Sequence, residues 1–215
     1  MIALIPMAGK GQRFLDAGYL TIKPLLDMGD DVVIEKVVRS IPVQCRLITI
    51  GSRQYAKDLF PTLNTACGDQ FDWGYFFCWI DNSMGPLDTL LKARKHYNYP
   101  EDLLIVYCDV VAPRPFVENF VETARQSGCP SAAVVFKSDN PRFGIIHEDH
   151  RGNTVVSGIF WFRNAQEFLK KAQEVNGNEI GVPSVLESPY LFLAILGKDF
   201  LDVGTPEDYE RFKML

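Results

Sequence analysis

Three features are scarce in this sequence, and each absence excludes a class of protein. No apolar run approaches the roughly 18 residues of a membrane-spanning helix. The opening stretch MIALIPMA has no basic region before it and runs into a glycine loop, unlike a secretory signal peptide. With 22 basic and 27 acidic residues, the net charge of −5 gives no indication of a nucleic acid or an anionic membrane as partner. We therefore expect a cytoplasmic protein without membrane insertion.

Paired cysteines are also lacking. The five cysteines are an odd number, they are widely spaced and no CxxC occurs: Cys45, Cys67, Cys78, Cys108 and Cys129. This pattern disfavours both a disulfide framework and a zinc site. It indicates reduced, mostly buried thiols.

What the sequence does contain is enough apolar material for a sizeable core, with 47% hydrophobic and 12% aromatic residues among 215. Short apolar runs alternate with helical patterns in the first half. This alternation predicts a parallel sheet covered on both faces. The expected strands are 2–6, 46–51, 75–80 and 102–109, and the expected helices are 32–41, 52–60 and one that begins at Gly85-Pro86.

The second half is less regular. Strands are expected close together at 131–136, 143–148 and 154–162, so part of the sheet should be antiparallel. A helix at 165–175, a late strand at 190–196 and a closing turn and helix follow. We interpret residues 1–215 as a single domain with halves 1–130 and 131–215.

The loop of residues 9–13, GKGQR, raises the first question about chemistry, because it follows a buried strand. Glycines allow backbone amides to approach a phosphate closely, and Arg13 can bind phosphate oxygens bidentately. The Gly-Lys-Ser/Thr ending of a P-loop and the third glycine of a dinucleotide fingerprint are both absent. The alternative is a tight turn with a solvated arginine.

Lys23 could add a positive charge to the same cleft. Pro24 biases the backbone of Lys23 toward an extended conformation. A lysine held in this way can act as a point charge for a phosphate. The alternative is an ordinary surface lysine.

Two aspartates follow or end expected strands. Asp109 ends LLIVYCD, and Asp202 lies in FLDVGTPEDY ahead of the helix start at Thr205-Pro206. The carboxyl end of a buried strand is where open α/β sheets place groups that handle ligands. The two carboxylates could share one Mg²⁺ held mainly by nucleotide phosphates. For Asp109, capping of a helix near Pro115 is the alternative.

Taken together, these segments resemble the sugar nucleotidyltransferases. The resemblance is carried by LIPMAGKGQRF and GYLTIKPLLDM at the start, by MGPLDTLLKAR, LLIVYCD and RFGII, and by FLDVGTPEDY near the end. It spans residues 1–215 and is closest to short members of the capsule or envelope type. It implies a Rossmann-like mixed, mostly parallel sheet flanked by helices, with a small antiparallel extension on the acceptor side. It also implies a nucleotide-binding half, 1–130, and an acceptor-binding half, 131–215.

The resemblance further implies roles for individual residues. Arg13 would hold the departing pyrophosphate and Lys23 the α-phosphate. Gly144 would contact the part of the acceptor that is not phosphate. The implied residues are Ala8, Gly9, Gly11 and Gly85 for the nucleotide, Arg13 and Lys23 for catalysis, Asp109 and Asp202 for Mg²⁺, and Gly144 for the acceptor.

One departure concerns the acceptor. The family usually has a Glu-Lys-Pro loop between the RFGII and SGIFWF strands, and its lysine grips the sugar phosphate. Here HEDHRGNTVV fills that interval without a lysine. Lys137, Arg142 and Arg151 are the nearby cations, and Arg142 is preferred because strand alternation keeps it on one face with Gly144. A solvated arginine is the alternative.

These observations predict a Mg²⁺-dependent nucleotidyltransferase. It would join an NTP to a phosphorylated sugar or small phospho-metabolite for surface polysaccharide or envelope biosynthesis, and it could form a homo-oligomer. The alternative is a nucleotide-binding, non-catalytic or regulatory paralogue. A GT-A glycosyltransferase is disfavoured because YCDVV is not the DxD motif of that class.

Overall fold

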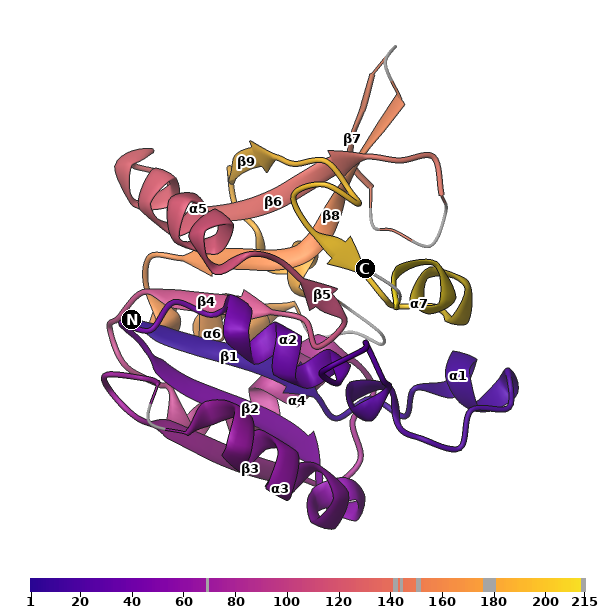
Figure 1. The fold of residues 1–215 in the computed structure, drawn as a ribbon. Coiled ribbons are helices and arrows are strands. Elements are labelled where there is room, and N and C mark those ends of the chain that lie inside the picture. Colours follow the sequence, from indigo (N-terminus) through magenta and orange to yellow (C-terminus); the bar gives the residue numbers. More distant parts are fainter. Residues whose placement is uncertain (69, 141–142, 144, 150–151, 176–180, 214–215) are drawn as a thin grey trace.

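The structure is a computed structural model that describes residues 1–68, 70–140, 143, 145–149, 152–175 and 181–213. Its framework is a mixed, mostly parallel sheet with helices on both faces (Figure 1). The strand order is β3-β2-β1-β4-β8-β6-β9, and β7 pairs with β8 beside this path. The α/β fold expected from the sequence is confirmed.

The first half supplies four parallel strands. They are β1 (Ile2–Met7), β2 (Arg46–Ser52), β3 (Tyr75–Ile80) and β4 (Leu103–Val106). β1 lies between β2 and β4 and is buried at every position, which explains its continuous apolar sequence. The strand expected at 102–109 ends earlier, at Val106. The backbone then turns, with Val110 N–H donating to the Tyr107 carbonyl at 3.1 Å.

The second half adds the antiparallel part. Its strands are β6 (Ser131–Lys137), β7 (Ile145–Asp149), β8 (Gly152–Phe162) and β9 (Tyr190–Leu193). β8 runs antiparallel to β4, β6 and β7, whereas β9 is parallel to β6. The hairpin of β7 and β8 extends beyond the body of the molecule (Figure 1).

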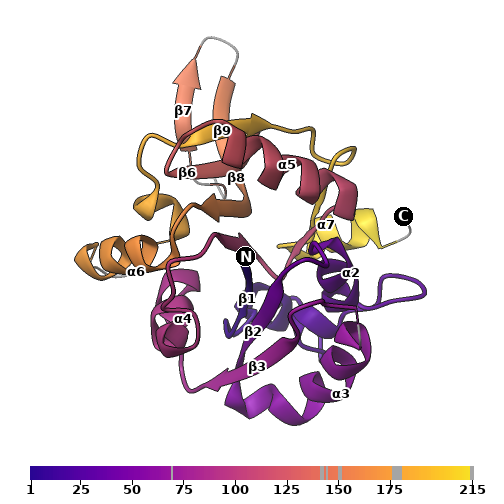
Figure 2. The same ribbon diagram turned by 90° about the vertical axis from the view of Figure 1, so that its left-hand side faces the viewer.

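Two apolar cores lie on opposite faces of the sheet. On β1, Ala3 and Ile5 belong to one core, and Ile2 and Leu4 to the other, because successive side chains of a strand alternate. Figure 2 shows the helices in two groups on either side of the strands. The first face is covered by α2 (Val33–Ser40), α3 (Ala56–Cys67) and α5 (Arg114–Gln126), and the second by α4 (Pro86–Ala93) and α6 (Ala165–Glu174).

Short elements connect these layers. They are α1 (Gln12–Asp16), η1 (Lys23–Leu25), η2 (Arg53–Tyr55), η3 (Arg94–His96), β5 (Val110–Val111), η4 (Val182–Val185), β10 (Leu201–Asp202) and α7 (Pro206–Phe212). β5 and β10 form a separate two-stranded antiparallel sheet. This small sheet joins the segment that follows β4 to the segment that precedes α7.

The C-terminal helix α7 anchors the segment that follows the glycine loop. The Tyr209 ring packs edge-on against Phe14 and Tyr19, with ring centroids 6.1 and 5.7 Å away. The Tyr209 hydroxyl donates to the Asp27 carbonyl at 2.7 Å, and the Tyr19 hydroxyl donates to Glu210 at 2.7 Å. The segment that carries Lys23 is therefore held at both of its ends by α7.

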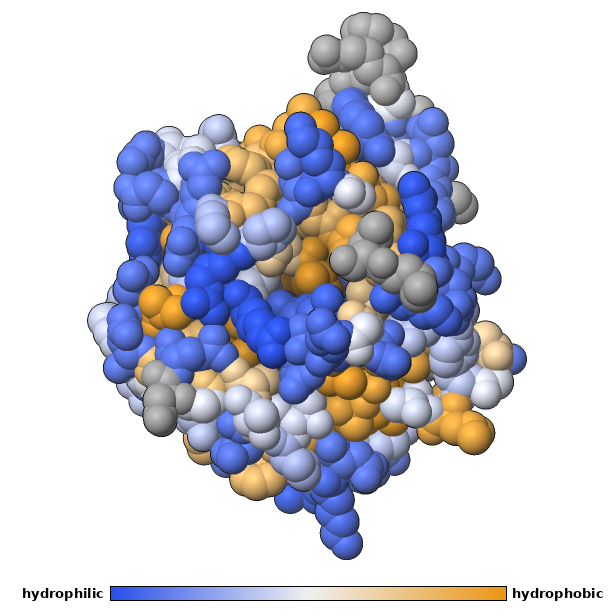
Figure 3. Space-filling view, viewed as in Figure 1, coloured by the Kyte–Doolittle hydropathy of each residue, from blue (hydrophilic) through white to orange (hydrophobic). Residues whose placement is uncertain are grey.

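The surface is mixed in character. Viewed as in Figure 1, apolar residues gather in a hollow between α5 and α7, and hydrophilic residues surround them (Figure 3). Among the residues that the structure describes, no helix combines the length and the apolar character needed to cross a membrane.

Candidate functional site

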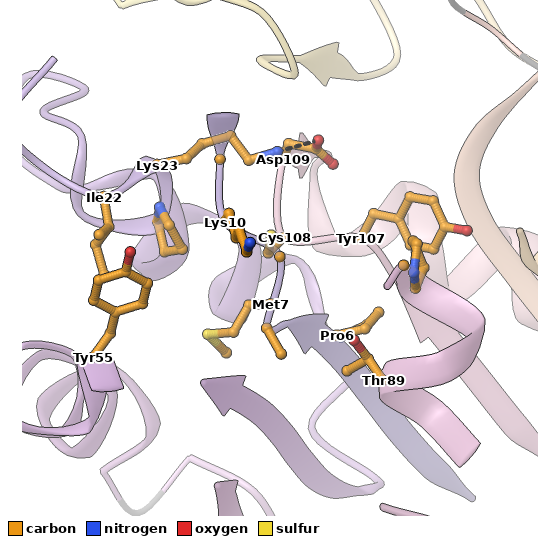
Figure 4. Close-up of a pocket in the computed structure, with 16 residues that line it drawn as sticks. Pro6, Met7, Lys10, Ile22, Lys23, Tyr55, Thr89, Tyr107, Cys108 and Asp109 are labelled. Atoms are coloured by element: carbon orange, nitrogen blue, oxygen red, sulfur yellow. Dashed lines mark hydrogen bonds and ion pairs between the residues drawn. The ribbon is translucent and has the colours of Figure 1, made fainter. Parts of the chain in front are cut away.

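A cleft opens at the carboxyl ends of β1 and β4 (Figure 4). One wall is the loop after β1, with Ala8, Gly9 and Gly11. Lys23 and Asp109 also line the cleft. The carboxyl edge of the parallel strands is where α/β sheets hold ligands, and the topology brings these distant residues to that edge.

The two glycines of the loop serve different purposes. Gly11 has φ 64° and ψ 32°, a left-handed conformation that disfavours residues with a side chain, and it begins α1. A Cβ at Gly9 would meet no atom within 4 Å. Gly11 therefore shapes the turn, whereas Gly9 leaves the backbone open toward the cleft.

The opposite wall begins at Gly85, directly before α4. The Ser83 hydroxyl lies 2.9 Å from the Gly85 carbonyl and 2.6 Å from the hydroxyl of Thr89. Thr89 is only 1% exposed and also lines the cleft. These contacts tie the loop before α4 to the first turn of the helix and fix the position of Gly85.

An ion pair within the cleft joins Lys23 to Asp109. Lys23 Nζ lies 2.6 Å from Asp109 Oδ2, and the two side chains are 17% and 19% exposed. Burial alone would lower the pKa of Lys23. The negative charge of Asp109, reinforced by that of Asp202, outweighs burial and raises the pKa above the ordinary lysine value. The ammonium group is therefore charged at neutral pH.

Asp202 reaches the same place through the β5–β10 pairing. Asp202 pairs with Val110, and Val203 N–H donates to the Asp109 carbonyl at 2.8 Å. A Cβ built on Gly204 would lie 2.9 Å from Asp202 Oδ1 and 3.2 Å from Asp109 Oδ2. Both carboxylates therefore face the small space beside Gly204, and a side chain at position 204 would displace the carboxylate of Asp202.

The pair of carboxylates is the set of side chains best suited to a cation. In the described ranges, no group of three or more histidine, cysteine or acidic side chains could hold a metal ion. Two carboxylates with a shared open side are nevertheless a donor set that Mg²⁺ uses when substrate phosphates complete its coordination. Asp109 and Asp202 thus fit such an ion.

Arg13 lies apart from this cluster. It is exposed on α1 and is not among the residues that line the cleft, whereas Lys10 is. Figure 4 shows the Lys10 side chain within the cleft. The sequence interpretation gave Lys10 no role. Its position beside the glycines is the only sequence signal that could have suggested one.

Most of the residues predicted to bind the acceptor fall outside the part of the chain that the structure describes. Gly144 and Arg142 lie outside the described residues, as does Arg151. Lys137 is described, and its Nζ donates to the Gly152 carbonyl at 3.0 Å.

Two further lining residues were missed by the sequence interpretation. Tyr55 lines the cleft from η2, and Tyr107 from the turn after β4. The Tyr107 ring packs 5.6 Å from Phe160, and its hydroxyl accepts a hydrogen bond from Val182 N–H at 3.4 Å. Tyr107 precedes Asp109 by two residues. Because Asp109 was expected at a cleft, this short spacing was the signal that could have indicated Tyr107 as a second lining residue.

Among the described residues that line the cleft, Cys108 is the one with a thiol. Burial raises its pKa to about 11, although Lys23 opposes this effect. The thiol is therefore protonated at neutral pH, and a thiolate nucleophile is not available here.

Comparison with known proteins gives a family match over most of the chain. The model of the MobA-like NTP transferase domain matches residues 3–186. A curated protein of Sulfolobus acidocaldarius, named "Putative mannose-1-phosphate guanyltransferase", is 25% identical over 155 residues. That match covers 62% of this chain and 41% of the relative, so this chain spans less than half of the relative's length.

Solved structures with the same fold cover nearly the whole chain. The nucleoside-diphosphate-sugar pyrophosphorylase from Vibrio cholerae RC9 has a TM-score of 0.76 and 17% identity, with 99% of both chains covered. A UDP-glucose pyrophosphorylase complexed with UDP-glucose has a TM-score of 0.77 and 16% identity, with 99% of this chain and 96% of that chain covered.

Without the positive charge of Lys23, the repulsion between the carboxylates of Asp109 and Asp202 would no longer be offset. We expect Lys23→Met to lower the free energy of unfolding by about 1–2 kcal/mol, less than the ~3–5 kcal/mol for a fully buried pair, because this pair is partly exposed. Because the folded pKa of Lys23 is raised, its stabilisation is fully present below about pH 10.4. This stabilisation is lost as the pH rises through the pKa that Lys23 has in the folded protein. Urea denaturation measures the change.

Lys10→Met is the matched control. Lys10 lies in the same cleft, but across the described part of the chain it has no ion pair. We expect its change in stability to stay within about 0.5 kcal/mol. Equal losses in the two variants would contradict a special role of the Lys23–Asp109 pair.

Proposed function

Because this chain belongs to the family of MobA-like NTP transferase domains, we propose that it transfers a nucleotidyl group from an NTP to a phosphorylated sugar or a similar small phospho-metabolite. The observation that carries this proposal is the convergence of Lys23 and the carboxylates of Asp109 and Asp202 beside a glycine loop. An open loop backbone, a cation and two acidic ligands together suit a metal-bound triphosphate.

The chemistry requires positioning and charge neutralisation more than a proton acceptor. A phosphate monoester has a second pKa of about 6, so it is mostly dianionic near neutral pH and already nucleophilic. Its oxygen would attack the α-phosphorus of the NTP. A new P–O bond forms as the bond to the β-phosphate breaks, and pyrophosphate leaves with the electron pair. No general base is needed.

The residues of the cleft would stabilise this displacement electrostatically. The amides around Gly9 and Gly11 would hold the phosphates, and Lys23 would turn from Asp109 toward the α-phosphate. Mg²⁺ bound by Asp109 and Asp202 would supply further neutralisation of the triphosphate charge. Gly85 would lie near the base, as the sequence resemblance implies.

The acceptor is proposed to be a sugar 1-phosphate. The names of the curated relative and of the solved neighbours, which mention mannose 1-phosphate, nucleoside-diphosphate sugars and UDP-glucose, support this choice. Gly144 and Arg142 remain the proposed acceptor residues. A role in capsule or envelope biosynthesis, a cytoplasmic location and a homo-oligomeric state are proposed from the same resemblance.

One observation favours a second candidate function. The sequence between β7 and the end of β8 lacks the lysine of the usual Glu-Lys-Pro loop. A nucleotide-binding paralogue without turnover would have no need of that lysine.

A pyrophosphate-release assay separates the two candidates. The protein would be given Mg²⁺, each NTP in turn and a panel of sugar 1-phosphates, with Asp109→Asn as the inactive control. We expect release that requires one NTP, one acceptor and an intact Asp109. Tight NTP binding without release for any acceptor would instead establish the non-catalytic candidate.

Arg13 and Lys10 are the two candidates for the cation that holds the leaving pyrophosphate. Although Arg13 does not line the cleft in this structure, we expect Arg13→Ala to lower kcat/KM for the NTP by about 10²-fold, because a guanidinium can bind phosphate bidentately as charge develops. Lys10→Ala should lower it by about tenfold or less. Steady-state kinetics of both variants at fixed Mg²⁺ would measure this difference. If Arg13→Ala kept the wild-type kcat/KM and Lys10→Ala lost most of it, Lys10 and not Arg13 would be the cation that holds pyrophosphate.

A further inference from the structure

A second depression lies at the other end of α4, away from the cleft. One wall is formed by η3 and the residues that follow it, and the other wall is formed by α6. The volume of the depression is about 330 Å³. Figure 2 shows α4 and α6 next to each other on the same side of the sheet. α4 begins beside Gly85 in the cleft, and a helix of eight residues is about 12 Å long. The two sites are therefore at opposite ends of one helix.

The charged side chains of this depression are all positive. Arg94 and Lys95 come from η3, and Lys170 comes from α6. No acidic residue lines it within the described part of the chain, and Glu167 and Glu174 of α6 are not among the lining residues. This is unusual for a chain in which acidic residues outnumber basic ones by 27 to 22.

These three cations also lack carboxylate partners, unlike their neighbours. Lys92 of α4 pairs with Asp88 at 2.8 Å, and Lys171 of α6 pairs with Glu187. Across the residues that the structure describes, Arg94, Lys95 and Lys170 form no such pair. Like charges gathered around one depression repel each other, and a bound anion would offset that repulsion.

The helix dipole accounts for only part of this cluster. Cations at the end of α4 interact favourably with its carboxyl end, and Arg94 Nη1 donates to the Leu91 carbonyl at 2.9 Å. This explains Arg94 and Lys95. It does not explain Lys170, which belongs to another helix and faces the same depression.

We propose that this depression is a second anion site, which binds small molecules bearing a phosphate group. The remaining N–H groups of Arg94 would form a fork for two phosphate oxygens, and Lys95 and Lys170 would supply point charges from the two walls. The side-chain amides of Asn98, Gln166 and Gln173 also line the site and can donate hydrogen bonds to the same ligand. The proposal depends on these side chains and not on the function proposed for the cleft.

Isothermal titration with inorganic phosphate and with pyrophosphate, at constant ionic strength, tests the proposal. The test variant is Lys95→Gln with Lys170→Gln, and the matched control is Lys57→Gln with Lys198→Gln, which removes two exposed lysines elsewhere. Because all four lysines are exposed, we expect both variants to fold like the wild type, and thermal denaturation checks this. Lys23→Met reports separately on binding in the cleft.

We expect the test variant to bind phosphate or pyrophosphate about 5- to 10-fold more weakly than the wild type does. The control variant and Lys23→Met should keep the wild-type affinity at this site. The two probes show whether one phosphate group is enough or a diphosphate is required. KM for the NTP should be unchanged in the test variant. Identical isotherms for the wild type, the test variant and the control would overturn the proposal, as would loss of all anion binding in Lys23→Met.

Discussion

The contact between Lys23 and Asp109 is the interaction on which the cleft depends. Two carboxylates, Asp109 and Asp202, face the same space above Gly204, and neither is fully solvated. Their mutual repulsion requires a nearby positive charge. Lys23 supplies it at 2.6 Å, and its raised pKa keeps that charge in place at neutral pH. In the proposed reaction, the same charges would serve the metal ion and the phosphates.

The rest of the fold brings these groups together. The buried strand β1 leads into the glycine loop, and the pairing of β5 with β10 sets Asp202 beside the backbone that carries Asp109. Helix α7 then holds the segment around Lys23 through Tyr209 and Tyr19. The last helix of the chain therefore contributes to the geometry of a site that begins near the first strand.

The sequence was most informative where burial leaves little choice. Continuous apolar runs identified β1 and β2. Asp109 and Asp202, which the sequence suggested as partners, lie close together in the structure, and their role as metal ligands stays a prediction. The sequence was less informative where contacts between segments that are distant in the chain determine the local structure. The end of β4 at Val106 is set by the turn into β5. The sequence suggested that Lys23 lies in the same cleft, but it did not predict the direct contact of Lys23 with Asp109. The choice between Lys10 and Arg13 likewise depends on the direction of a turn, which spacing alone does not determine.

A crystal structure with Mg²⁺ and the preferred NTP would test the central claim most directly. We expect one Mg²⁺ between the carboxylates of Asp109 and Asp202, triphosphate oxygens on the amides around Gly9 and Gly11, and Lys23 Nζ moved from Asp109 to the α-phosphate. A triphosphate bound elsewhere, or a Lys23–Asp109 contact that persists at 2.6 Å beside a metal-free pair of carboxylates, would contradict this account.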